Sequence, residues 1–187
     1  FRVATNVISE PGPQPAEPGP QPAPANGEQG QTSYLAVVDG DELRSIDTAT
    51  GIVTFLGTLD DSSKGLAAVG SDVYSLCSDC EELNRIDPAD GTNLEEITIT
   101  LAGESINNAN GMAYDAANGI LYAVLRINAN SGPDLRNLTT LDPVTGVATS
   151  IGILSDKFSS LAFDSTADTL YGITGDGADV PATLYSI

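Results

Sequence analysis

The sequence predicts an all-β fold built from an internal repeat. Short apolar segments of roughly four to six residues alternate with turn signals from residue 33 onward, which is typical of strands. These segments recur with a period of roughly 45 to 50 residues, so one unit is copied several times. No window places apolar residues at i, i+3, i+4 and i+7 between helix caps, and almost no helix is expected.

The first half of the repeat unit is a pair of short apolar segments. GLAA at 65–68 precedes VYSL at 73–76, GMAY at 111–114 precedes LYAV at 121–124, and SLAF at 160–163 precedes LYGI at 170–173. Each pair predicts two neighbouring antiparallel strands. Two copies of this half therefore begin at Gly65 and Gly111, and a further one begins at Ser160.

The second half of the unit is an apolar-Asp-x-x-x-Gly turn followed by another strand. Residues 141–152, LDPVTGVATSIG, align with residues 46–57, IDTATGIVTFLG, and residues 86–91, IDPADG, begin a third copy. An Asp at such a turn accepts hydrogen bonds from its own backbone, and the Gly takes the left-handed position. Ca²⁺ takes about six to eight oxygens, so one Asp per separated turn favours turn formation over calcium binding. The Asp residues concerned are Asp47, Asp87, Asp115, Asp142 and Asp164.

The complete unit of four short strands has the size of a propeller blade. Its pattern, L-Y-x-I-D-P-x-T-G-x-x-T-x-I-G, resembles the blades of secreted and cell-surface bacterial β-propeller repeat proteins. The resemblance covers roughly residues 33–187 and implies a β-propeller-like fold of about four blades. It implies no catalytic residues, because propellers host binding, scaffolding and catalysis alike.

Strand counting predicts that the last blade is incomplete. It contains Leu161–Phe163, Leu170–Ile173 and a third strand made of Thr183, Leu184, Tyr185, Ser186 and Ile187, and the fourth strand is missing. Residues 3–7, VATNV, align with residues 147–151, VATSI, in an outer strand. Side chains alternate along a strand, so Val3, Thr5 and Val7 would share one face, as Val147, Thr149 and Ile151 do. We expect this face to be buried when residues 1–9 complete a blade.

The length of the linker indicates whether residues 1–9 complete a blade of their own subunit or of a neighbouring one. Residues 10–32 are rich in proline and contain a tandem EPGPQPA heptad, ahead of the propeller domain at 33–187. As polyproline II, at about 3.1 Å per residue, residues 10–25 would reach about 50 Å. A spacer of this length favours pairing of residues 1–9 with a neighbouring subunit over pairing with the last blade of the same subunit. The sequence therefore predicts an extracellular structural subunit that polymerises head to tail into a filament by donor-strand complementation.

Composition bears on the competing functions. The 187 residues carry seven Lys and Arg against 26 Asp and Glu, a net charge of −19, which disfavours nucleic acid and anionic lipid as partners. Histidine is absent, so Ser-His-Asp and Cys-His arrangements are excluded, and we expect no enzyme, no cofactor and no metal site.

Two alternatives stay open: a monomeric propeller, closed in cis, that binds a carbohydrate or protein ligand, and a propeller-class enzyme such as a lyase or glycosidase. Ca²⁺ stays open as a counter-ion.

Cys77 and Cys80 form a CxxC motif between two short strand-like segments, where a redox motif, half a zinc site or a local disulfide are the options. Zinc would need two further ligands, and neither Cys nor His is left to supply them. A disulfide that closes a hairpin turn is therefore expected, which favours an oxidising compartment and an extracellular or cell-surface location.

Two further features carry weaker expectations. Asn137 heads the N-x-[ST] sequon Asn137-Leu138-Thr139, which permits a glycan. Residues 126–136 predict an enlarged loop, for which a binding loop, a subunit contact and an inert insertion all stay open.

Overall fold

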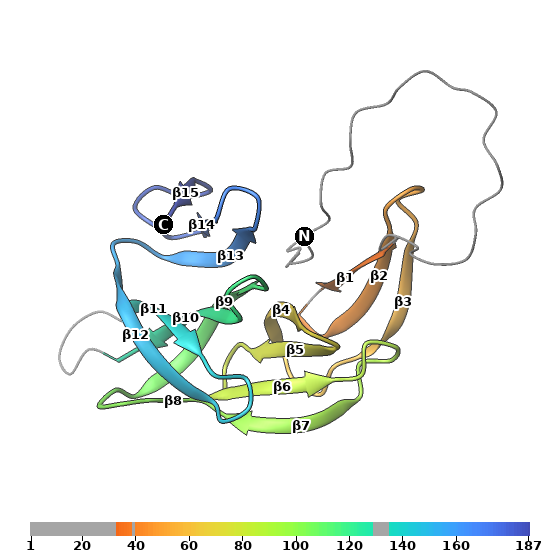
Figure 1. Ribbon diagram of the computed structural model, residues 1–187, viewed down its shortest axis with the longest axis horizontal. Coiled ribbons are helices and arrows are strands. Elements are labelled where there is room, and N and C mark those ends of the chain that lie inside the picture. Colours follow the sequence, from red (N-terminus) through yellow and green to blue (C-terminus); the bar gives the residue numbers. More distant parts are fainter. Residues whose placement is uncertain (1–32, 39, 129–134) are drawn as a thin grey trace, which may run out of the picture.

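The computed structural model describes residues 33–38, 40–128 and 135–187, which form four β-sheets and contain no helix (Figure 1). The first sheet contains β1 (Ser33–Val38), β2 (Glu42–Asp47) and β3 (Val53–Thr58). The second contains β4 (Ser63–Val69), β5 (Asp72–Cys77), β6 (Glu82–Ile86) and β7 (Asn93–Thr98). The predicted all-β fold is confirmed.

The third sheet has one strand more than the repeat predicts. Its four antiparallel strands are β9 (Ile106–Asp115), β10 (Ile120–Ile127), β11 (Leu135–Leu141) and β12 (Val147–Leu154). The short strand β8 (Thr100–Leu101) pairs in parallel with the outer edge of β12, where Thr100 lies opposite Val147. The chain thus covers the outer edge of this sheet with its own connection from the second sheet.

The fourth sheet has three strands, β13 (Phe158–Asp164), β14 (Thr169–Thr174) and β15 (Leu184–Ser186). Its last strand is shorter than the five residues expected, since Thr183 and Ile187 lie outside it. The loop expected at 126–136 is also shorter, because β10 extends through Ile127 and β11 starts at Leu135. Arg126 and Arg136 are paired across these two strands.

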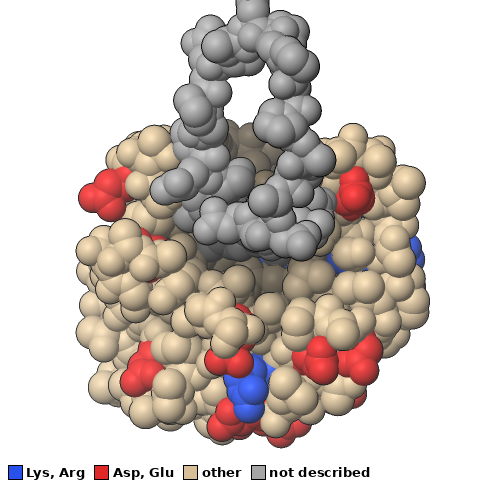
Figure 2. Space-filling model, turned by 45° about the vertical axis from the view of Figure 1, so that its right-hand side comes forward, with Lys and Arg blue, Asp and Glu red and all other residues tan. Residues whose placement is uncertain are grey.

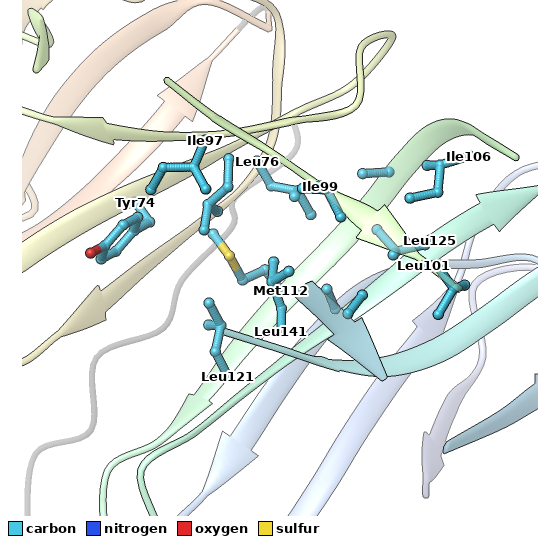
Figure 3. Close-up of a cluster of buried hydrophobic side chains, with 14 of the residues drawn as sticks. Tyr74, Leu76, Ile97, Ile99, Leu101, Ile106, Met112, Leu121, Leu125 and Leu141 are labelled. Carbon is cyan, nitrogen blue, oxygen red and sulfur yellow. The ribbon is translucent and has the colours of Figure 1, made fainter. Parts of the chain in front are cut away.

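The sheets follow one another around an arc, as the blades of a propeller do (Figure 1). The first strand of each contacts the first strand of the next, in the order β1, β4, β9 and β13. A separate apolar cluster fills each interface. Leu43 and Leu66 lie between the first and second sheets, Leu76 and Leu125 between the second and third, and Val124 and Phe163 between the third and fourth. Figure 3 shows the middle cluster, with Met112 beside Leu121 and Leu141.

The Asp turns form as expected. The carboxylate of Asp47 accepts hydrogen bonds from the backbone of Ala49 at 3.0 Å and Thr50 at 2.8 Å, and Gly51 follows with φ of 71°. The hydroxyl of Thr50 also donates to this carboxylate and holds the pKa of Asp47 below its ordinary value. Asp142 repeats the arrangement with Val144, and Gly146 has φ of 72°. These carboxylates act as turn formers.

Gly111 gives a test of the packing between the third and fourth sheets. A Cβ there would lie 2.7 Å from the Cα of Ser160 on β13, whereas at Gly152 it would meet nothing within 4 Å. Gly111→Ala should therefore lower the free energy of unfolding by about 1–3 kcal/mol, because backbone must move. Gly152→Ala should leave it within about 0.5 kcal/mol. Urea unfolding of both variants checks this, and equal midpoints would show that the two sheets do not pack as described.

Candidate functional site: the open edge and outer face of the last sheet

The outer edge of β15 is unpaired among the described residues. β15 pairs with β14 through Gly172 opposite Tyr185 and Ile173 opposite Leu184. The corresponding third strands of the second and third sheets, β6 and β11, are each covered by a fourth strand. An uncovered strand offers its free backbone N–H and C=O groups to an added strand.

The inner face of the last sheet anchors this edge. Tyr185 packs against Phe158 with ring centroids 5.4 Å apart, and Phe163 stacks on Tyr122 of β10 at 6.1 Å. Leu161 and Leu170 complete the same cluster. β15 is thus held in place by side chains from the third and fourth sheets, and its free edge belongs to an ordered element.

The outer face of the last sheet is apolar, and no other sheet of the described residues covers it. Ile173 and Leu184 lie directly opposite each other on this face and are 39% and 65% exposed. The third sheet, by contrast, buries Leu125 on one face and Val124 on the other. An inner sheet is covered on both faces, so the last sheet has one face available for a partner. We call this surface the outer face of the last sheet.

The first sheet has a matching apolar face at the other end of the arc. Val53 and Phe55 on β3 are 49% and 51% exposed, on the side away from the cluster shared with the second sheet. The guanidinium of Arg44 lies 5.7 Å from the centre of the Phe55 ring. Each end of the described arc therefore presents exposed apolar side chains, which is the arrangement that a head-to-tail contact or a ring closure would use.

The segment that leads into β15 is tied down by Asp156. Its carboxylate accepts hydrogen bonds from the backbone of Lys157 at 2.7 Å, Asp179 at 2.9 Å and Val180 at 3.1 Å. The hydroxyl of Thr174 donates to the carbonyl of Val180 at 2.6 Å. The bond from Val180 is the main cause of the lowered pKa of Asp156, and the other two backbone bonds add to it.

These contacts predict an acid-sensitive tether. The folded pKa of Asp156 lies below the ordinary value of 3.8, so its stabilising contribution is complete above about pH 3.8 and is lost as pH falls through the lowered folded pKa. The amide proton shifts of Asp179 and Val180 should therefore change together at a midpoint below 3.8 in an NMR titration. The variant Asp156→Asn should show no such change. A midpoint at or above 3.8 would contradict the tether.

The residues of β12 with which the predicted donor face aligns are exposed. Val147 and Ile151 on β12, the residues with which Val3 and Val7 align, are 52% and 53% exposed, while Ala148 is 5% exposed and belongs to a core cluster. Only one face of β12 meets the core, and it is the face of Ala148. Residues 1–9 lie outside the described residues, so Val3, Thr5 and Val7 are not placed. The same alignment assigns the inward position to Ala4 instead.

Two other residue predictions meet the structure directly. Cys77, at the end of β5, and Cys80, in the turn before β6, form a disulfide with their Cα atoms 5.6 Å apart. Asn137 is only 3% exposed within β11, and its Oδ1 accepts a hydrogen bond from the hydroxyl of Ser150 at 2.9 Å. A glycan at Asn137 does not fit this buried position.

A run of asparagines on β9 was missed by the sequence reasoning. The Nδ2 group of Asn108 donates to Asp79 at 2.8 Å, and that of Asn107 donates to Asn128 at 2.6 Å. The Oδ1 atoms of Asn108 and Asn110 are shielded from solvent and accept no hydrogen bond. Three Asn residues within INNANG, on a strand predicted to be the first of its blade, are the signal that could have pointed to a polar site.

The surface charge is distributed. Figure 2 shows acidic side chains spread around the visible face, with neutral surface between them. Among the described residues, no helix is long and apolar enough to cross a membrane.

Comparison with known proteins places the fold. Neither a family model nor a curated protein matches the sequence. Among solved structures, a gluconolactonase from Xanthomonas campestris is similar with a TM-score of 0.59 and 16% identity, over 83% of this chain and 53% of that one. A glutaminyl cyclase from Myxococcus xanthus is similar with a TM-score of 0.52 and 13% identity, over 82% of this chain and 72% of that one.

A third similar structure is an auxiliary nutrient binding protein from Bacteroides ovatus, with a TM-score of 0.51 and 16% identity, over 76% of this chain and 33% of that one. The chain spans about half of the gluconolactonase and a third of the nutrient binding protein. Together with the four sheets, these similarities define a β-propeller-like protein.

The expectation that the chain is not an enzyme is contradicted by these comparisons. Two proteins that share the fold, the gluconolactonase and the glutaminyl cyclase, are enzymes by name. The absence of histidine does not exclude catalysis, because the fold accommodates it, and general acids and bases also include carboxylates, lysine and tyrosine.

Proposed function

We propose that this chain is an extracellular structural subunit that polymerises head to tail. Residues 1–9 act as a donor strand that pairs with the outer edge of β15 in the next subunit, and residues 10–32 span the distance between them. The partner is thus another copy of the same chain. The observation that carries this proposal is the open edge of β15 beside an apolar outer face with Ile173 and Leu184 exposed.

Strand addition at an outer edge has a parallel within the chain. β8 pairs with the outer edge of β12, the strand with which residues 3–7 align, through Val147 and Ala148. Outer strands of these blades are therefore able to form ladders with a segment from another part of the chain. The disulfide between Cys77 and Cys80 supports an extracellular or cell-surface location, because disulfides persist in oxidising compartments.

Sedimentation velocity over a range of concentrations tests the proposal. The full chain should give a ladder of oligomers that lengthens with concentration, and electron microscopy of the concentrated sample should show filaments of regular repeat. A full chain that stays monomeric at every concentration would overturn the proposal.

A monomeric ligand-binding propeller, closed in cis, is the second candidate, and the asparagines of β9 favour it. The Oδ1 atoms of Asn108 and Asn110 accept no hydrogen bond. Rotation of these amides toward solvent would let a ligand rich in hydroxyl groups, such as a carbohydrate, donate to them. In that case the monomer should bind an oligosaccharide in a glycan array, and Asn110→Ala should weaken the binding without lowering the unfolding temperature of the monomer.

A further inference from the structure

Three potential metal ligands meet where the second sheet begins. Asp61 lies in the segment between β3 and β4, Cys77 ends β5, and Cys80 lies in the turn that follows. One carboxylate oxygen and the two sulfur atoms all lie within 4.8 Å of one another. Zinc binds sulfur at about 2.3 Å and oxygen at about 2.0–2.2 Å, so such atoms need only small shifts to share one ion once the sulfurs separate.

Asn84 on β6 adds a fourth group at the same place. Its side chain is 4% exposed, and its Nδ2 group donates to Oδ2 of Asp61 at 3.4 Å. Its Oδ1 atom is buried and accepts no hydrogen bond. A buried amide oxygen without a donor costs free energy. Turning the amide about its last bond would bring this oxygen to the side of Asp61, which is favourable only if a cation lies there.

We propose that the reduced chain binds one thiophilic divalent cation, such as Zn²⁺, through Cys77, Cys80 and Asp61, with the amide oxygen of Asn84 as the fourth ligand. The turn between β5 and β6 would then have two closed forms, one held by the disulfide and one held by the metal. This inference is independent of the proposed assembly, since the site lies in the second sheet and the open edge lies in the fourth.

The chemistry balances with a dithiol as the reductant. The dithiol gives two electrons and two protons to the disulfide, so that the S–S bond of Cys77 and Cys80 breaks, two thiols form, and the dithiol becomes a disulfide itself. The cation then displaces both thiol protons and forms two metal–sulfur bonds. A disulfide oxidant reverses this step: it takes two electrons from the two thiolates and two protons from water and becomes a dithiol, while the S–S bond of Cys77 and Cys80 forms again and the cation is released.

Cobalt binding to the full chain tests the site. The chain is reduced with a dithiol, freed of reductant under anaerobic conditions and titrated with Co²⁺, whose thiolate charge-transfer and d–d bands report sulfur ligation and tetrahedral geometry. One equivalent should bind, and Zn²⁺ should displace it. The oxidised chain should show neither band. Absence of the bands after reduction, or binding of equal strength by the oxidised chain, would overturn the proposal.

Asp61→Asn has a matched control in Asp60→Asn, the same change at the exposed neighbour. Mutation of a residue that only hydrogen-bonds to a metal ligand typically weakens metal affinity about 10–100-fold. Loss of a direct ligand should therefore weaken Co²⁺ binding at least about tenfold. Asp60→Asn should bind as the parent chain does. Equal affinities for the two variants would remove Asp61 from the site and overturn the proposal.

A second variant guards against a folding defect. Cys80→Ser should fold, because it removes only a disulfide that closes a very short loop, and it should lose most of the charge-transfer intensity. Urea unfolding of the oxidised Asp61→Asn and Asp60→Asn chains should give matching midpoints. If Cys80→Ser kept the full charge-transfer band, the two-sulfur site would be wrong.

Discussion

Deletion of residues 1–9 should leave a soluble subunit that no longer assembles. Without the donor strand, the edge of β15 stays open and no neighbour supplies the backbone groups that would pair with it. Sedimentation velocity should show monomer at concentrations where the full chain forms a ladder. A synthetic peptide of residues 1–9 should then bind the truncated subunit with one-to-one stoichiometry. Assembly that continues after the deletion would contradict strand donation.

The alignment of residues 3–7 with β12 gives a matched pair of variants within this experiment. Ala4 aligns with Ala148, which is 5% exposed, and Val3 aligns with Val147, which is 52% exposed. A charged side chain at the inward position loses its hydration, whereas at the outward position it stays in water. Ala4→Arg should therefore abolish assembly, and Val3→Arg should leave it nearly unchanged. The opposite ranking would show that the strand enters in the other register.

The double variant Ile173→Asp and Leu184→Asp should block assembly while the monomer stays folded. Both residues lie on the outer face of the last sheet, 39% and 65% exposed, so the carboxylates are hydrated in the monomer. A subunit contact over this face would bury them, and an unpaired buried charge costs at least several kcal/mol. Sedimentation velocity and thermal unfolding together check the two parts of this prediction.

The control for this variant is Val144→Asp and Ile153→Asp, which adds the same charge at positions 77% and 52% exposed, one in the turn before β12 and one on β12 of the third sheet. The control chain should assemble as the parent does. Equal loss of assembly in both double variants would point to net charge as the cause. A ring closed in cis makes a different forecast, since the outer-face variant would then lower the unfolding temperature of a monomer.

The repeat made the fold predictable from local signals. Asp47 and Asp142 open turns that are built from bonds to residues two or three positions ahead, so their structure is encoded within a few residues. Short apolar runs bounded by turn signals, such as Leu121–Val124, are typical of buried strands. For the same reason, the close spacing of Cys77 and Cys80 allowed a disulfide to be expected from the sequence.

Other features depend on contacts between distant segments, which no local pattern reports. The pairing of β8 with β12 joins residues 47 positions apart, Thr100 with Val147 and Leu101 with Ala148. The sequon at Asn137 would read the same in an exposed loop. Asn137 is buried because Ser150 and the neighbouring strands pack around it. Asp61 meets Cys77 and Cys80 only because β4 and β5 pair and bring the start of one beside the end of the other.

The sequence by itself determined the strand-rich repeat, the turns and the approximate number of blades, because each rests on alternation and turn chemistry within a few residues. The tertiary structure alone decided which face of each strand is buried. Val147 and Ala148 are neighbours in one strand, and only the position of the adjacent sheet makes the alanine buried and the valine exposed. Alternation predicts that a strand has two different faces, but the sheet that packs against it decides which of them meets the core.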